Sequence, residues 1–120
     1  MNKLQKVLED CQNTGSWYGI KISSVNERND FGDTPLHTVC SWGKLDPVRI
    51  LLEAGANINA QGEHGATPIF NGVASNNLDL VKMLLTRGAE KGAKIFGSTS
   101  LADYAKDVGS SKEILALLKK

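Results

Sequence analysis

The sequence contains a repeat with a period of 33 residues. Segments 32–60 and 65–93 align in register, and the tail 101–118 continues the spacing. Matching residues recur at turns, at helix starts and along an apolar helix face; they include Gly32 and Gly65, Thr34 and Thr67, Pro35 and Pro68, and Leu51, Leu84 and Leu117. Units of this length bury their apolar surface only by stacking on neighbours. The repeat therefore predicts an all-α solenoid of paired helices.

Each unit is predicted to begin with a short helix. Thr34 and Thr67 provide N-cap hydroxyls directly before a proline, which suits the first helical position because no N–H is needed there. Gly43 and Asn76 follow at the other end, and both residue types accept the left-handed backbone of a helix C-terminus. We expect Gly109 to end the corresponding helix of the third unit.

A second helix is predicted to follow in each unit. Asp46 can cap it before Pro47, and Asp79 stands in the matching place of the next unit. Gly55 and Gly88 are expected to end the two copies. The apolar positions have the three-and-four spacing of a helix that packs on neighbours; they are Val48, Leu51 and Leu52 in one copy and Val81, Leu84 and Leu85 in the next.

Four stretches of this sequence resemble ankyrin repeats: TPLH at 34–37, GKLDPVRILLEAGANINA at 43–60, TPIF at 67–70 and NLDLVKMLLTRGA at 77–89. The resemblance covers roughly residues 25–120. It implies an L-shaped stack of helix pairs with projecting hairpin-like loops, which binds other proteins through its loop tips and inner helices. It implies no enzymatic activity, no cofactor and no metal.

We expect one domain over residues 1–120, consisting of an N-terminal cap helix with an irregular segment (1–24), full repeats at 25–60 and 61–93, and a C-terminal capping repeat (94–120). With both ends covered, we expect a complete small protein. In the last part ADYAKDVG is similar to the closing unit of ankyrin arrays. Because Gly97 falls one residue early in the repeat, either Thr99 or Ser100 could cap the helix there.

The N-terminal 24 residues depart most from the repeat. LQKVLEDC places Leu4, Val7, Leu8 and Cys11 on one face, which predicts an amphipathic helix laid against the stack. Two interpretations of the apolar side chains that follow remain open. These side chains are Trp17, Tyr18, Ile20 and Ile22. In the first interpretation, which we favour because terminal repeats are atypical, the side chains plug the open end of the solenoid. In the second, they form an exposed recognition site.

Composition is that of an ordinary globular domain. A hydrophobic content of 41% and a net charge of +1 over 120 residues give no reason to expect nucleic-acid binding. Apolar runs are far shorter than the roughly 18 residues of a membrane span, and the N-terminus lacks signal-peptide character. We therefore expect a cytoplasmic protein, with no membrane or direct nucleic-acid partner, that is monomeric on its own.

Catalysis and metal binding are disfavoured. Asp33, His37 and Cys40 could be imagined as a nucleophile arrangement. However, His37 belongs to the TPLH motif, in which the resemblance implies an imidazole that braces the neighbouring loop. His37 and His64 have no ligand partners at a recognised metal-site spacing. Cys11 and Cys40 lack metal or redox spacing, and we expect both to be free thiols.

The resemblance implies partner contacts at the hairpin tips and on the inner face of the first helices. In the loops the corresponding residues are Asp30, Phe31, Asp33, Glu63, His64, Ala66, Ile95 and Phe96. On the helices they are Thr38, Ser41, Trp42, Asn71, Ser75 and Asp107. Trp42 is the leading candidate anchor because tryptophan is enriched among interface hot spots. The alternative is that Trp42 packs sideways onto Asn71, Val73 or the adjacent repeat.

A protein that binds a partner but catalyses no reaction has two principal roles open to it. An adaptor or scaffold would hold a partner without blocking it, whereas an inhibitor would occlude it, as an immunity protein neutralises a bacterial nuclease-type toxin. A regulatory subunit of an enzyme complex is a remoter alternative. Because Asp30, Asp33 and Glu63 give the loop side negative charge, the partner is expected to present a basic surface.

Overall fold

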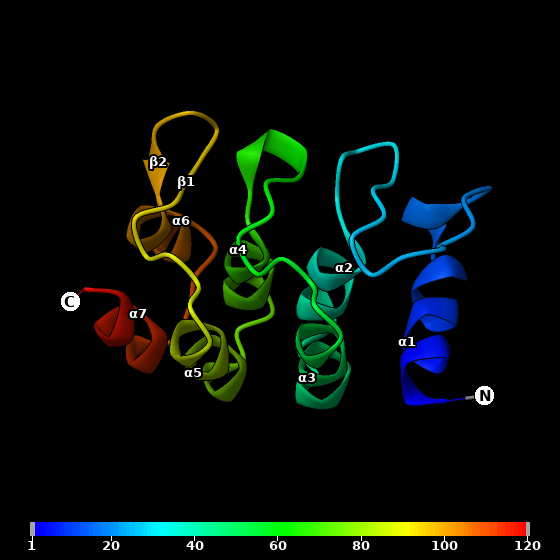
Figure 1. Ribbon diagram of the computed structural model, residues 1–120. Coiled ribbons are helices and arrows are strands. Elements are labelled where there is room, and N and C mark those ends of the chain that lie inside the picture. The colour runs from blue at the N-terminus through cyan, green and yellow to red at the C-terminus, as the bar shows by residue number, and fades with distance from the viewer. Residues whose placement is uncertain (1, 120) are drawn as a thin grey trace.

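A computed structural model describes residues 2–119, and the first and last residues of the predicted domain lie outside this part. The described chain is an elongated all-α stack of 40 × 26 × 21 Å (Figure 1). Its elements are α1 (Lys3–Gln12), the 3-10 helix η1 (Gly15–Trp17), α2 (Pro35–Trp42), α3 (Leu45–Glu53), the 3-10 helix η2 (Glu63–Gly65), α4 (Pro68–Ala74), α5 (Leu78–Thr86), β1 (Lys94–Ile95), β2 (Thr99–Ser100), α6 (Leu101–Asp107) and α7 (Lys112–Leu118).

Figure 1 shows two rows of helices, with α2, α4 and α6 next to the loops and α3, α5 and α7 farther from them. The loops that precede α2, α4 and α6 all project to the same side of the stack. The last of these loops is a short antiparallel hairpin in which Ile95 pairs with Thr99. This arrangement confirms the predicted solenoid and its projecting loops.

The first helix of each unit begins and ends as predicted. Thr34 and Thr67 are the N-cap residues of α2 and α4, each with a proline at the first helical position. Of the two candidates in the third unit, Ser100 is the cap, because its Oγ accepts a hydrogen bond from Asp103 N–H at 3.1 Å. Gly43 and Asn76 both have a positive φ just after their helices, which explains the Gly or Asn found there.

The predicted start of the second helix is wrong by one or two residues. α3 begins at Leu45, and Asp46 lies in its first turn, where it forms an ion pair with Arg49. In α5 the cap is Asn77, whose Oδ1 accepts from Leu80 N–H at 3.1 Å, while Asp79 lies in the first turn. Acidic side chains are favourable in a first turn without capping it, so their position alone did not fix the boundary.

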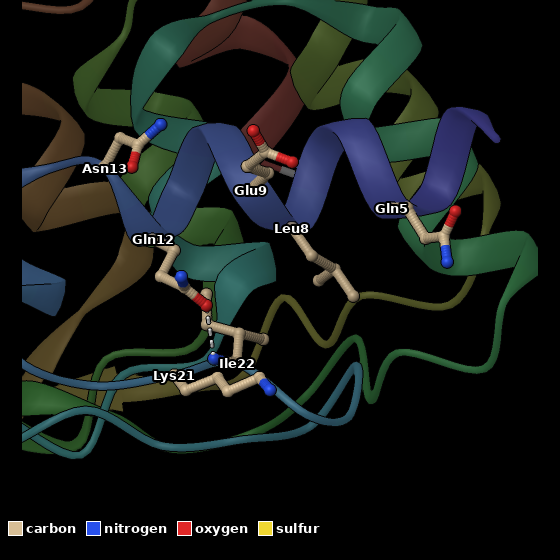
Figure 2. A pocket seen from close by; sticks show the side chains of 7 residues that line it. All are labelled: Gln5, Leu8, Glu9, Gln12, Asn13, Lys21 and Ile22. Carbon is tan, nitrogen blue, oxygen red and sulfur yellow. Dashed lines mark hydrogen bonds between the residues drawn. The ribbon is translucent and has the colours of Figure 1, made fainter. Parts of the chain in front are cut away.

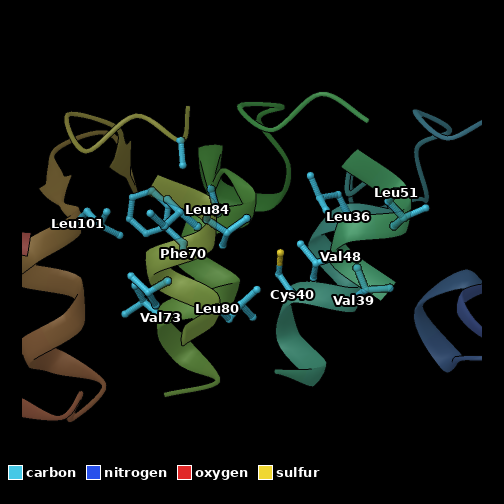
Figure 3. Close-up of a cluster of buried hydrophobic side chains, with 14 of the residues drawn as sticks. Leu36, Val39, Cys40, Val48, Leu51, Phe70, Val73, Leu80, Leu84 and Leu101 are labelled. Atoms are coloured by element: carbon cyan, nitrogen blue, oxygen red, sulfur yellow. The ribbon is translucent and has the colours of Figure 1, made fainter. Parts of the chain in front are cut away.

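The core runs the length of the stack, from one repeat into the next (Figure 3). Leu51 and Leu84, which are equivalent in the repeat, are both completely buried. Val48 and Val81 are buried beside them, while Leu52 and Leu85 are partly buried. The shared burial confirms the apolar face predicted for the second helices.

The N-terminal segment closes one end of the stack. Val7 and Cys11 of α1 are buried, as the predicted amphipathic face requires. Trp17 is also buried, and its Nε1–H donates to Thr38 Oγ1 at 2.9 Å. Tyr18 is 88% exposed, so its assignment to the plug is wrong. Trp17 takes the buried position, because the N–H of its ring finds a hydrogen-bond partner in Thr38 there.

Candidate functional site

A hollow of about 210 Å³ lies on the loop side of the stack, between the projecting loops and the helices α2, α4 and α6. We call it the groove site. It is lined by Asp33, Ser41, Glu63, His64, Ala66, Phe70, Asn71, Ala74, Ile95, Phe96 and Tyr104. These residues come from three consecutive units, so the stacking of the repeats creates the site.

One wall of the groove site consists of two aromatic side chains at neighbouring loop tips. The ring centroids of His64 and Phe96 lie 5.0 Å apart, and Phe96 N–H donates to His64 O at 2.9 Å. Both residues have a positive φ, at 59° and 56°; histidine is among the residue types enriched in this region, whereas a bulky phenylalanine there is unfavourable. Phe96 nevertheless remains 59% exposed. The loops therefore hold a large apolar ring at the surface in a costly conformation.

The floor of the groove site is also aromatic. Phe70 is buried, and its ring meets that of Tyr104 edge to face with centroids 5.3 Å apart. Partial burial raises the pKa of Tyr104, because the charged phenolate would lose solvation. Tyr104 therefore remains a neutral phenol that can donate a hydrogen bond.

Two carboxylates stand at the loop side of the groove site. Asp33 Oδ1 accepts from Glu63 N–H at 2.9 Å, which ties the first loop to the second. The Nε2 atom of the His64 ring lies 3.9 Å from Glu63 Oε2. Within residues 2–119, neither carboxylate forms an ion pair with a lysine or an arginine. Arg28 lies close by but bonds backbone oxygens, since its Nη1 donates to Gly32 O at 2.6 Å and to Gln61 O at 2.7 Å.

His37 lies beneath this region and acts as a structural brace. Its Nδ1 accepts from Thr34 N–H at 3.0 Å, so the neutral ring carries its proton on Nε2, which donates to Ala66 O at 2.8 Å. Burial lowers the pKa of His37, which keeps the ring neutral. The contact with Ala66, which belongs to the next loop, confirms the bracing role that the TPLH motif implied.

The imagined nucleophile arrangement has no chemical support. Both cysteines are free and buried. Burial raises the pKa of Cys11 to about 12 and raises that of Cys40 as well, so both thiols stay protonated. Both ring nitrogens of His37 are already hydrogen bonded, which leaves no free base. Among residues 2–119 no group of three or more potential metal ligands is found.

The structure brings most of the predicted binding residues together. Eight of them line the groove site: Asp33, Ser41, Glu63, His64, Ala66, Asn71, Ile95 and Phe96. Outside it lie Asp30, Phe31, Thr38, Trp42, Ser75 and Asp107. Thr38 already accepts the Trp17 hydrogen bond, and Ser75 Oγ donates to Gly72 O at 2.6 Å. A role for these outlying residues in binding stays a prediction.

Three lining residues were not predicted: Phe70, Ala74 and Tyr104. A signal existed for two of them. Ala74 occupies the repeat position of Ser41, and Tyr104 that of Asn71, so both stand in register with predicted residues. Phe70 occupies the position of His37, which faces the interior in the first unit. Extending each predicted position through all repeats would have found Ala74 and Tyr104.

Trp42 lies apart from the groove site. It ends α2, is partly buried against the core, and lines a separate surface hollow with Asp10 and Lys44. Another hollow, of about 530 Å³, lies at the N-terminal end of the stack against α1 (Figure 2). There Gln12 Oε1 accepts from Ile22 N–H at 2.7 Å. Neither hollow includes residues of the groove site.

Comparison of the sequence with known protein families agrees with this architecture. A model of ankyrin repeats, in three copies, matches residues 7–95, and the chain belongs to the ankyrin-repeat family. The match begins inside α1, earlier than the resemblance read from the sequence, and ends before α6. No curated protein matches the chain. Ankyrin repeats generally mediate protein–protein interaction, and the family is typically non-enzymatic. No helix within residues 2–119 has the length and apolar character needed to cross a membrane.

Proposed function

We propose that this chain binds one protein partner through the groove site and acts as an adaptor or as an inhibitor of that partner. The observation that carries the proposal is the convergence of eight predicted contact residues in one hollow lined by three repeat units. Exposed aromatic rings and polar groups around a concave surface are typical of protein interfaces.

The carboxylates of Asp33 and Glu63, which form no ion pair with a lysine or arginine within residues 2–119, favour a partner with a basic surface. Electrostatic complementarity of this kind speeds association and rejects wrong partners. An enzyme that acts on nucleic acid has such a surface, and this favours an inhibitor, such as an immunity protein, as the second candidate. In both roles the chain works as a cytoplasmic monomer that contacts neither membrane nor nucleic acid directly.

The test is affinity capture from a lysate of the source organism with four versions of the chain. Glu63→Arg reverses a charge in the groove site, whereas Glu53→Arg makes the same change at an exposed position of α3. Trp42→Ala tests the separate hollow around Trp42. We expect wild type to retain a stoichiometric partner. The Glu53→Arg and Trp42→Ala variants should retain the same partner, whereas the Glu63→Arg variant should lose it. If the Glu63→Arg variant retains the partner and the Trp42→Ala variant loses it, the partner binds around Trp42 and not at the groove site.

The purified partner then separates the two roles. An inhibitor should bind with nanomolar or tighter affinity and abolish the partner's activity. An adaptor should bind more weakly and leave the activity intact. Calorimetry with the purified pair, followed by an activity assay at saturation, distinguishes these outcomes.

A further inference from the structure

The groove site has the size of a recess for one side chain. Its volume of about 210 Å³ is below the roughly 300–1,000 Å³ of pockets that hold drug-sized ligands. A protein partner would therefore insert a single residue there. The chemistry of the lining indicates which residue fits.

The charge of the lining selects a cation. Asp33 has one carboxylate oxygen bonded to Glu63 N–H, while its other oxygen has no hydrogen bond within residues 2–119. Glu63 is half exposed, and its carboxylate meets only the His64 ring at 3.9 Å. Neither Lys94 nor Arg28 lines the hollow, and Arg28 Nη1 donates to the backbone oxygens of Gly32 and Gln61 at 2.6 and 2.7 Å. A cationic side chain would supply the missing partner for both carboxylates.

The aromatic lining selects among cations. Phe96, Tyr104 and Phe70 line the same hollow as the carboxylates. Cations are attracted to ring faces, and arginine is found there more often than lysine. A guanidinium group is planar, weakly hydrated and able to bond carboxylates through two parallel N–H groups, whereas an ammonium group is compact and strongly hydrated. Aromatic surface beside carboxylates therefore suits arginine better than lysine.

We propose that the groove site receives an arginine side chain of the protein partner, with the guanidinium group between the Asp33 and Glu63 carboxylates and the rings of Phe96 and Tyr104. This inference rests on the proposed function and names the chemistry of the residue that is recognised. An apolar side chain would leave the carboxylates without a cation, and an acidic one would be repelled by them.

The experiment uses the full chain, labelled with nitrogen-15, and three short peptides. The probes are acetyl-Gly-Gly-Arg-Gly-Gly-amide and its lysine and citrulline counterparts, because citrulline keeps the planar shape of arginine and lacks its charge. Amide chemical shifts are followed to about 10 mM peptide, so that a Kd of about 1 mM can be measured. We expect the arginine peptide to shift the amides of Glu63, Asn71 and Phe96 and to bind about tenfold more tightly than the citrulline peptide.

Two variants test the contributions of the carboxylates and of the aromatic rings to arginine binding. Glu63→Gln removes a carboxylate, and Phe96→Asn removes a ring at a positive φ that asparagine tolerates. Each should weaken the arginine peptide several-fold, while Glu53→Gln should bind like wild type. A dispersed spectrum shows that each variant is folded. Equal binding of arginine and citrulline, stronger binding of lysine, absence of shifts, or shifts confined to the N-terminal hollow would overturn the proposal.

The two proposals fail in different ways. A partner that is lost by Glu63→Arg in the capture experiment supports the proposed function even when the peptides show no preference for arginine. Lack of preference among the peptides would then reject only the proposal that the groove site receives an arginine side chain. Retention of every partner by Glu63→Arg would reject binding through the groove site whatever the peptides show.

Discussion

The first and second repeats start with the same Thr-Pro pair, but they contact the neighbouring unit by different means. In the first repeat His37 joins Thr34 to Ala66 through hydrogen bonds at both ring nitrogens. In the second repeat Phe70 occupies the same position and packs against Tyr104. One polar contact is thereby lost, because Thr67 Oγ1 is buried and has no hydrogen-bond partner within residues 2–119. The difference turns a polar brace into the aromatic floor of the groove site.

Asn26 and Asn59, which occupy equivalent positions of the repeat, show no such difference. Asn26 Nδ2–H donates to Gly55 O at 3.3 Å, and its Oδ1 accepts from Asn57 N–H at 2.9 Å. Asn59 repeats the pattern with Gly88 O at 3.2 Å and Glu90 N–H at 3.0 Å. These two asparagines therefore make equivalent contacts in the two repeats.

The largest effect should come from Phe70→Ala. Removal of a buried ring leaves a cavity beside Tyr104, and such changes cost about 3–5 kcal/mol. Urea unfolding measures the loss. The cost should be nearly independent of pH, because the contact carries no titratable proton near neutrality. A cost below about 1 kcal/mol would show that the aromatic floor does not hold the second and third units together.

A smaller loss is expected from Gly62→Ala. A Cβ at this position would collide with Asp33 Oδ1 and lie 2.9 Å from His37 Nε2. Overpacking of this kind costs about 1–3 kcal/mol. Gly92→Ala is the matched control, because its Cβ would meet no atom within 4 Å, and its stability should stay within about 0.5 kcal/mol of wild type. Equal thermal melting of the two variants would contradict the close approach of the loops.

Thr34→Val and Thr67→Val compare the two caps directly. Thr34 Oγ1 lies 3.0 Å from His37 Nδ1, so its loss should cost about 0.5–1.5 kcal/mol. The Thr67 hydroxyl has no partner in the described part of the chain, so valine there should be neutral or slightly stabilising. Chemical denaturation of both variants gives the difference, and a larger cost at Thr67 would refute the comparison.

The smallest effect is a pH dependence that belongs to the first repeat. The pKa of His37 is lowered below its ordinary 6.5 in the folded chain, so the unfolded chain binds more protons as the pH falls. The stabilisation is complete above pH 6.5 and is lost as the pH falls toward the folded pKa. At pH 5.5 this one group accounts for at most about 1.4 kcal/mol.

The variant that isolates this titration is His37→Phe, which places the residue type of the second repeat in the first. We expect it to be less stable than wild type at pH 7.5, because Thr34 N–H and Ala66 O lose a partner, and we expect the gap to narrow toward pH 5.5. Unfolding midpoints across this range provide the measurement. A gap that stays constant would mean that His37 does not stay neutral in the fold.

Much of the fold could be predicted because local residue types determine it. The proline and threonine pairs set the starts of α2 and α4, and Gly43 and Asn76 set their ends. The predicted starts of the second helices are wrong by one or two residues, since an aspartate suits both the N-cap and the first turn. Eight of the groove residues were predicted, because the resemblance to ankyrin repeats implies contacts at the loop tips and on the inner face of the first helices.

By itself, the sequence determined the period, the helix boundaries near proline and glycine, and the apolar face that makes the units stack. These properties depend on backbone preferences and on apolar spacing within a single unit. Only the tertiary structure decided that Trp17 is buried while Tyr18 is exposed, that Trp42 lies apart from the groove site, and that Tyr104 lies in it. The physical reason is that burial and site membership depend on which neighbouring unit fills the adjacent space.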